Sequence, residues 1–105
     1  MTCKAHGCTN TVLRALEDVT LCLQHFLQDV NERSRTFAQQ LDDHTAEEPA
    51  REAALQFIVL TAAKIATIGT YSPPEEQLER GRLLNAMLQL ADLRDRLDRS
   101  GLGTN

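Results

Sequence analysis

Aromatic side chains are scarce in this sequence, which narrows the folds it can adopt. Phe, Tyr and Trp together make up only 4% of the 105 residues, and Trp is absent. A core must therefore be built from Leu, Ile, Val and Ala, a composition that favours helices over a β-sandwich or barrel. A chain of this length can bury one core but not two, so we expect a single domain over residues 1–105.

Positive charge is also in short supply. The chain has 11 Lys and Arg residues against 15 Asp and Glu, which gives a formal net charge of −4. Proteins that bind nucleic acid regardless of sequence neutralise its phosphates with Lys and Arg side chains. We therefore do not expect nucleic acid as a partner.

Targeting and membrane-spanning features are missing from the sequence as well. Its first residues, MTCKAHGC, lack the apolar region of a signal peptide. The longest apolar run, AALQFIVLTAAKIATIG (53–69), is shorter than a bilayer span and contains Gln56 and Lys64. We expect a cytoplasmic protein with no membrane partner, whose cysteines are reduced and available to a metal.

Beyond residue 22 the apolar residues follow helical spacing, which predicts helices over 22–43, 49–69 and 73–100. In the first of these they recur at i, i+3, i+4 and i+7, as on a helix with one buried face. The second is apolar nearly all round, so it is either the central helix of a bundle or a dimer interface. The stripe of the first helix consists of Leu23, Phe26, Leu27, Val30, Ser34, Phe37, Ala38 and Leu41.

The predicted helix ends rest on capping residues. Pro49 suits the first turn of the second helix, and Gly69 suits its C-terminal cap. Ser72 is a good N-cap for the third helix, with Pro73 at its first position and Glu75 completing a capping box.

The fold class that follows is mostly α, an antiparallel three-helix bundle. Short connections between three helices favour an up-down-up arrangement. Three helices nevertheless cover an all-apolar helix poorly. We therefore expect the 53–68 helix to bind a second copy, as a dimer, or another protein.

The first 22 residues differ from the rest and hold all the cysteines. The stretch TVLRALEDVTLC (11–22) predicts two short strands around a turn near residues 17–18. A short helix over 13–18 is the alternative.

A zinc site is predicted from Cys3, Cys8, Cys22 and His25, which are spaced C-x4-C-x13-C-x2-H. Structural zinc takes four tetrahedral Cys or His ligands, commonly in two close pairs. Gly7 permits a tight turn between the first pair, and i, i+3 spacing puts the second pair on one helical face.

This arrangement resembles the treble-clef type of zinc module over residues 3–30. It departs from the commonest pattern, because four residues separate Cys3 from Cys8 where two are usual. The resemblance implies one structural Zn²⁺ per chain and says little about a partner. No family is recognised for the helical remainder.

Other interpretations of these residues remain open. The cysteines could be a buried apolar side chain and two loose thiols, or a redox site. His6 could replace one ligand, whereas His44 in the acidic linker is expected to be solvated. A closed four-ligand site has no open position for water, so the metal would act as a staple between the N-terminal segment and the first helix.

Catalysis is not expected. The sequence contains no phosphate-binding glycine loop, nucleophile elbow or Ser/His/Asp set. Solvation and helix capping account for the clustered carboxylates, namely Asp42, Asp43, Glu47, Glu48, Glu75 and Glu76.

The function predicted is therefore a non-catalytic, zinc-stapled helical module that binds protein. One alternative is a small nucleic-acid-binding or transcriptional regulator, with a basic patch made by Lys4, Arg14, Arg33 and Arg35. The other is a thiol redox or zinc sensor, in which oxidation of Cys3 and Cys8 would expel the metal.

Overall fold

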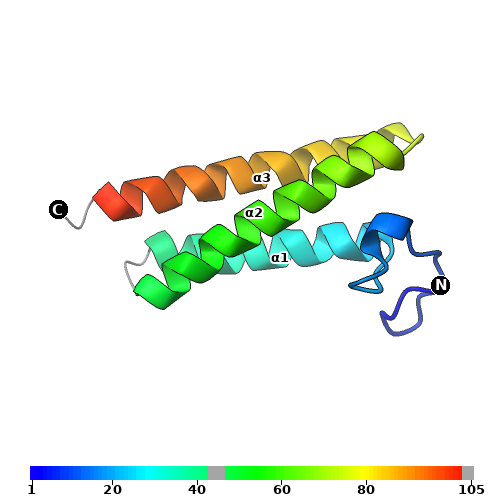
Figure 1. The fold of residues 1–105 in the computed structure, drawn as a ribbon, viewed down its shortest axis with the longest axis horizontal. Coiled ribbons are helices and arrows are strands. Elements are labelled where there is room, and N and C mark those ends of the chain that lie inside the picture. The colour runs from blue at the N-terminus through cyan, green and yellow to red at the C-terminus, as the bar shows by residue number, and fades with distance from the viewer. Residues whose placement is uncertain (43–46, 103–105) are drawn as a thin grey trace.

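The computed structural model describes residues 1–42 and 47–102; for residues 100–102 it describes the backbone only. The described chain forms a short 3₁₀ helix, η1 (Arg14–Leu16), and three α-helices. These are α1 (Leu23–Asp42), α2 (Glu48–Tyr71) and α3 (Gln77–Leu102), packed into an elongated bundle of 47 × 25 × 19 Å (Figure 1). The predicted mostly helical bundle is confirmed.

The helix that contacts both of its neighbours is α3, not the apolar α2. It packs along α1 and α2, whereas α1 and α2 touch each other at few points and cross obliquely (Figure 1). The buried residues of α3 recur every three or four positions, so one face of this helix meets both partners. These residues are Leu83, Ala86, Leu90, Leu93 and Leu97.

The apolar stripe predicted for α1 is confirmed. Five of its members, Phe26, Leu27, Val30, Ser34 and Leu41, are buried, and the other three are half-buried. Where α1 meets α2, the rings of Phe37 and Phe57 lie 5.3 Å apart between centroids. The guanidinium carbon of Arg33 lies 4.6 Å from the centroid of the same Phe57 ring, a cation–π contact between α1 and α2.

The predicted end of the second helix is wrong by two residues. Gly69 does not cap α2, which continues through Tyr71. The backbone N–H of Ser72 donates the last helical hydrogen bond to the carbonyl of Ile68, at 2.9 Å. Ser72 precedes a proline, and a residue in that position is disfavoured in the α conformation. Pro73, rather than Gly69, therefore ends the helix.

The capping box predicted for the third helix does not form. Ser72 is the C-cap of α2, and α3 begins only at Gln77. Two consecutive prolines explain the delay, because Pro74 keeps Pro73 out of the α conformation. The Arg80 guanidinium donates to the carbonyls of Pro74 at 3.0 Å and of the next residue at 2.5 Å. This side chain thereby satisfies two carbonyls of the connection, whereas a capping box would have satisfied backbone N–H groups at the start of the helix.

The N-terminal segment contains a helical turn where strands were predicted. Within residues 1–22 the only pairing of strand type is an isolated antiparallel bridge between Thr2 and Thr11. The alternative, a short helix near 13–18, is confirmed by η1. One reason is the run RALED, whose residues are better helix formers than strand formers.

This segment docks on the bundle through η1. Leu16 at its end is fully buried, with an exposed fraction of 0%. The ammonium of Lys64 in α2 donates to both carboxylate oxygens of Asp18, at 2.5 and 2.6 Å, and to the carbonyl of Ala15 at 3.4 Å. An apolar contact and an ion pair thus join the segment to α2 as well as to α1.

By length and composition alone, α2 could cross a bilayer, because it extends beyond the apolar run at 53–69. The core helix of a soluble protein passes the same test. Here 33% of the most apolar stretch of α2 is buried, so much of its apolar surface is exposed.

Candidate metal centre

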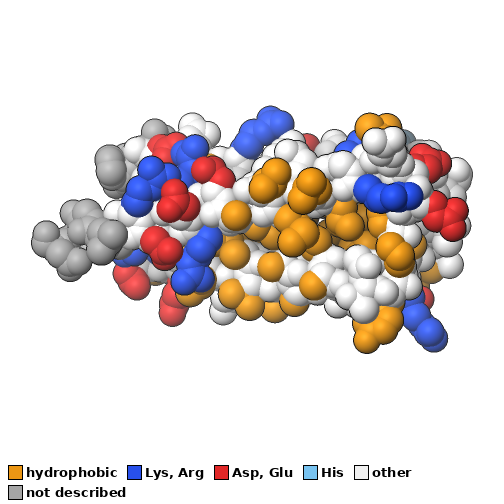
Figure 2. Space-filling view, turned by 90° about the horizontal axis from the view of Figure 1, so that it is seen from above, with side chains coloured by type: hydrophobic (Ala, Val, Ile, Leu, Met, Phe, Trp, Pro, Cys, Tyr) orange, Lys and Arg blue, Asp and Glu red, His pale blue; other side chains and the backbone are white. Residues whose placement is uncertain are grey.

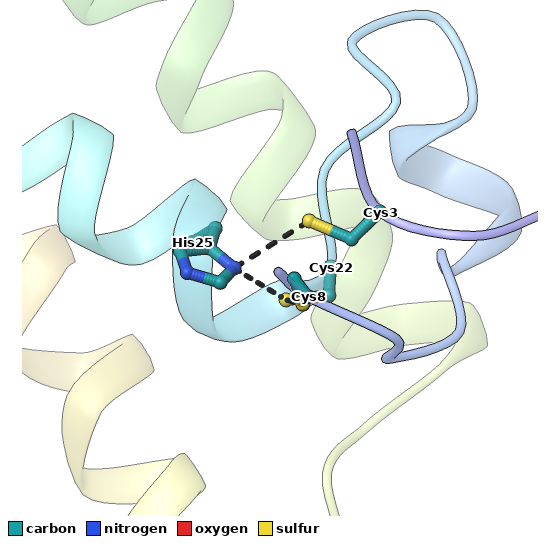
Figure 3. A group of neighbouring side chains, drawn as sticks. All are labelled: Cys3, Cys8, Cys22 and His25. Carbon is teal, nitrogen blue, oxygen red and sulfur yellow. Dashed lines mark hydrogen bonds between the residues drawn. The ribbon is translucent and has the colours of Figure 1, made fainter. Parts of the chain in front are cut away.

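The four predicted ligands converge on one point (Figure 3). The Nδ1 atom of His25 lies 3.2 Å from the sulfur of Cys22 and 3.4 Å from that of Cys3. The sulfurs of Cys8 and Cys22 are 3.9 Å apart. All four donor atoms lie within 4.8 Å of one another, so the group could hold a metal ion.

These distances match a tetrahedral zinc site better than a disulfide. With Zn–S bonds of about 2.3 Å and Zn–N bonds of about 2.0–2.1 Å, tetrahedral ligand atoms lie about 3.6–3.8 Å apart. The 3.2–3.9 Å separations above bracket that range. A disulfide needs sulfurs about 2.05 Å apart, and all three cysteines are free. Three thiols and one imidazole are the donor set of a structural zinc site.

A tight turn presents the first ligand pair. The backbone N–H of Cys8 donates to the carbonyl of Ala5 at 3.0 Å, and Gly7 between them has a φ of +77°. That value lies in the left-handed region, which glycine adopts without a steric penalty. The predicted role of Gly7 is therefore confirmed.

The second ligand pair lies at the start of α1. Cys22 immediately precedes the helix, and its carbonyl accepts a hydrogen bond from the N–H of Phe26 at 2.9 Å. The backbone N–H of His25 helps to lower the pKa of the Cys22 thiol. Cys22 therefore stands at the helix start and belongs to the ligand cluster at once.

Two of the three thiols are acidified by the backbone around them. Burial raises the pKa of Cys3, but the N–H groups of Cys22 and Ala5 outweigh it and lower that pKa to about 6. Burial likewise raises the pKa of Cys22, and hydrogen bonds from the His25 backbone and the Asn10 side chain lower it overall. Both sulfurs thus sit where the thiolate, the form that binds metal, is stabilised.

The pKa values of the other two candidate ligands, Cys8 and His25, are raised by these neighbouring sulfurs. The backbone N–H of Asn10 lowers the pKa of Cys8, but burial and the sulfurs of Cys3 and Cys22 outweigh it and raise that pKa. The same two sulfurs raise the pKa of His25 by hydrogen bonding. The site is therefore one in which negative charge accumulates and a cation can replace protons.

Sequence reasoning missed Asn10. Its carbonyl accepts the N–H of Cys3 at 3.0 Å, and its side-chain amide donates to the Cys22 sulfur at 3.7 Å. Asn10 thus hydrogen-bonds to one member of each ligand pair, and contacts of this kind behind the ligands orient them toward a metal. A turn-forming polar residue two positions after Cys8 was the available signal.

Thr20 was also missed. It has a φ of +56°, an uncommon conformation for a β-branched residue. Its carbonyl accepts the N–H of Lys4 at 2.8 Å, which ties the first ligand pair to the segment before the second.

The remaining candidates lie outside the cluster. His6 is exposed and takes no part in it, and His44 is not among the described residues. The predicted basic residues are not all on one side. Lys4 and Arg33 line the cleft between α1 and α2, whereas Arg35 lines a hollow between α1 and α3. Residues i and i+2 are about 200° apart around a helix.

The clustered carboxylates form ion pairs or lie at helix starts and in connections. Asp42 forms an ion pair with Arg96, and Glu48 lies 3.6 Å from Arg51. Asp43 is not among the described residues. Glu47 is the N-cap residue of α2, and Glu75 lies in the connection before α3.

The sequence matches no protein-family profile, and no curated protein or solved structure is significantly similar to it.

Proposed function

We propose that this chain is a non-catalytic helical module that binds one Zn²⁺ structurally and interacts with other proteins. The observation that carries the metal assignment is the convergence of Cys3, Cys8, Cys22 and His25 within 4.8 Å. Zinc fits because sulfur-rich four-ligand sites with tetrahedral spacing are typical of it.

The proposed role of the metal is a staple. Four protein ligands fill a tetrahedral shell, so no position remains for a reacting water or substrate. The ion would hold residues 3–8 against the first turn of α1, and its binding free energy would also be folding free energy. A treble-clef type of module is the proposed class for residues 3–30, supported by the turn that carries Cys8 and the helix start that carries Cys22.

Protein binding is proposed from the exposed apolar surface of the bundle. Val59 and Leu60 in α2 are exposed to 56% and 67%, and Leu84 in α3 to 58%. Soluble monomeric proteins rarely expose large apolar patches, and where such patches occur they often mark sites of interaction with another protein. The cytoplasm, where thiols stay reduced, is the proposed compartment.

The metal assignment is tested by native mass spectrometry of protein purified without chelator or added metal. One zinc per chain is expected, with protons lost to match the ionised thiols. His25→Ala should abolish stoichiometric binding, whereas His6→Ala should leave it unchanged, since His6 lies outside the cluster. Zinc retained by His25→Ala, or a metal-free wild type, would refute the assignment.

A thiol sensor is the second candidate, favoured by one contact. The sulfur of half-buried Cys8 lies 3.9 Å from that of Cys22. Hydrogen peroxide could take two electrons from this pair of zinc-bound thiolates and two protons from solvent, forming one S–S bond and two waters and releasing the metal. Zinc release within minutes of mild peroxide treatment, reversed by a thiol reductant, would favour this function over the staple alone.

A further inference from the structure

One face of the bundle is made of apolar residues from both α2 and α3. On α2 the exposed positions recur at i, i+4, i+7 and i+11, and on α3 at i, i+3 and i+7, so each set follows one helical face. We call this surface the α2–α3 face. It consists of Leu55, Val59, Ala62, Ala66, Leu84, Met87 and Ala91, all of them exposed.

Neighbouring residues locate this face on the side of α2 that adjoins α3. Leu55 lines a hollow together with Arg94 and Leu97 of α3, and Arg94 is two helical turns from Met87. The other exposed leucine of α2, Leu60, points elsewhere. It lines the cleft of about 700 Å³ between α1 and α2.

The α2–α3 face carries no charge over its central part. Neither residues 53–63 of α2 nor residues 83–91 of α3 include Asp, Glu, Lys or Arg. Figure 2 shows hydrophobic side chains gathered over the middle of the molecule, with most charged side chains toward its two ends. Depletion of charge at the centre of a patch, with a polar rim, is the pattern of a protein interface.

The accessible surface area of the chain supports the same interpretation. A compact monomer of 11.7 kDa is expected to expose about 5,900 Å². This chain exposes 7071 Å², an excess of about 1,200 Å² over the expected value. A stable dimer buries about 800 Å² per partner. The excess belongs to the whole elongated chain, and it is larger than the area that one partner buries in such an interface.

We propose that the α2–α3 face binds the same face of a second copy of this chain. The proposal rests on the proposed function and identifies its protein partner. In a two-fold symmetric dimer each patch meets itself, so a charge near its centre would face an identical charge. A face without central charge avoids that repulsion.

The resulting assembly is a four-helix bundle. Each copy contributes its antiparallel α2–α3 pair, and α2 gains the cover that the monomer does not give it. The small side chains Ala62 and Ala66 leave room for larger ones, such as Val59 and Met87, from the partner. The metal centres lie outside this interface, since their ligands belong to residues 3–25.

The test compares two neighbouring substitutions in zinc-loaded, full-length protein. Val59→Glu places a charge on the α2–α3 face, and Leu60→Glu places the same charge one residue away, on the cleft. Sedimentation equilibrium over a dilution series should show a dimer for wild type and Leu60→Glu. For Val59→Glu the dimer dissociation constant should rise by about 100-fold or more, because an unpaired charge would be buried. Far-UV circular dichroism and zinc content establish that each variant is folded.

Met87→Glu provides an independent variant from α3, should Val59→Glu fail to fold, and the same loss of dimer is expected. A wild type that stays monomeric at all concentrations would overturn the proposal, as would dimers that survive both face substitutions. Loss of the dimer in Leu60→Glu alone would assign the interface to the cleft instead. Binding of monomers to neutral phosphatidylcholine vesicles through Val59 would assign the face to a bilayer.

The two proposals fail separately. Dimeric protein that never contains zinc would refute the structural metal and leave the interface standing. Monomeric protein with one zinc per chain would refute the dimer and leave the metal staple standing.

Discussion

The N-terminal segment and the helical bundle are held together by different chemistry. Residues 1–22 contain one turn of 3₁₀ helix and an isolated bridge, and three of the four candidate ligands lie among them. Two of their apolar side chains, Val12 and Leu16, are buried in the core, whereas the bundle of α1, α2 and α3 depends mainly on burial of Leu, Ile, Val and Phe. In the N-terminal segment, a metal at the cluster would add to the little apolar burial that so short a segment can supply.

The two regions also differ in the range of their contacts. The metal ligands all lie between residues 3 and 25. The contacts of the bundle join distant residues, such as Gln89, whose side chain donates to the Asn31 side chain at 2.5 Å, whereas the contacts of Lys64 with Ala15 and Asp18 tie the N-terminal segment to α2. Disturbing the metal centre should therefore affect one region, and disturbing the core should affect the whole chain.

The largest expected effect is loss of the metal. Cys22→Ser or a strong chelator should reduce the zinc content from one per chain to none, because apparent binding free energies of about 10–16 kcal/mol require a complete ligand set. Amide hydrogen exchange should become fast in residues 1–22 and stay slow in α3. Fast exchange throughout α3 would show that the two regions fold as one unit and would abolish the distinction drawn above.

A substitution in the bundle core should act in the opposite way. Leu93 is 1% exposed, and Leu93→Ala should lower the free energy of unfolding by about 2–5 kcal/mol without changing zinc stoichiometry. Leu88→Ala on the same helix is the matched control, because Leu88 is 60% exposed. Urea denaturation monitored by circular dichroism measures both. Equal effects of the two would contradict the assignment of Leu93 to the core.

A smaller effect, of opposite sign, is expected at the strained residue of the N-terminal segment. Thr20→Gly should raise the free energy of unfolding by about 1 kcal/mol, since a left-handed conformation costs a non-glycine residue about that much. Thr9→Gly should give no such gain, because Thr9 is not among the residues of positive φ. Denaturation of the zinc-loaded variants decides between these outcomes.

The smallest effect concerns the ion pair that links the two regions. The hydrogen-bonded Lys64 ammonium lowers the pKa of Asp18 below its usual 3.8. A carboxyl whose pKa is depressed on folding contributes stability above its unfolded pKa and loses it as the pH falls through its folded pKa. Asp18→Asn should thus destabilise the chain at pH 6 by about 0.2–1 kcal/mol, as for other exposed pairs. The difference from wild type should shrink as the pH falls below 3.8 and vanish once Asp18 is protonated in the folded chain; a difference that does not shrink with falling pH would rule out the ion pair as its cause.

The helices were predictable from the sequence, but three of their ends were not. The bounds of α1 and the start of α2 were predicted to within one residue, whereas α2 and α3 each continue two residues past their predicted ends and α3 begins four residues late. The connection at Ser72 was misread because its residues satisfy the rules for an N-cap and for a C-cap. A second proline, Pro74, decides between them by steric exclusion.

The ligand set was predictable because it depends on spacing and residue type alone. Asn10 and Thr20 were not, since their roles follow from backbone conformations that no periodic pattern specifies. The assignment of α3 as the shared helix was also out of reach. It depends on how three apolar faces meet in space; of the two roles predicted for α2, the central position belongs to α3, and the dimer interface stays a prediction.

The position of Cys22 and His25 at the start of α1 bears on folding kinetics. The slow step in forming a helix is nucleation, in which the first turn is ordered for a single hydrogen bond, with an equilibrium penalty of about 10⁻³. A metal bridging Cys22 and His25 would fix the residues of that first turn before any long-range contact exists. The ion would then set where α1 begins and also hasten its formation, because the turn it orders is the nucleus from which the helix propagates.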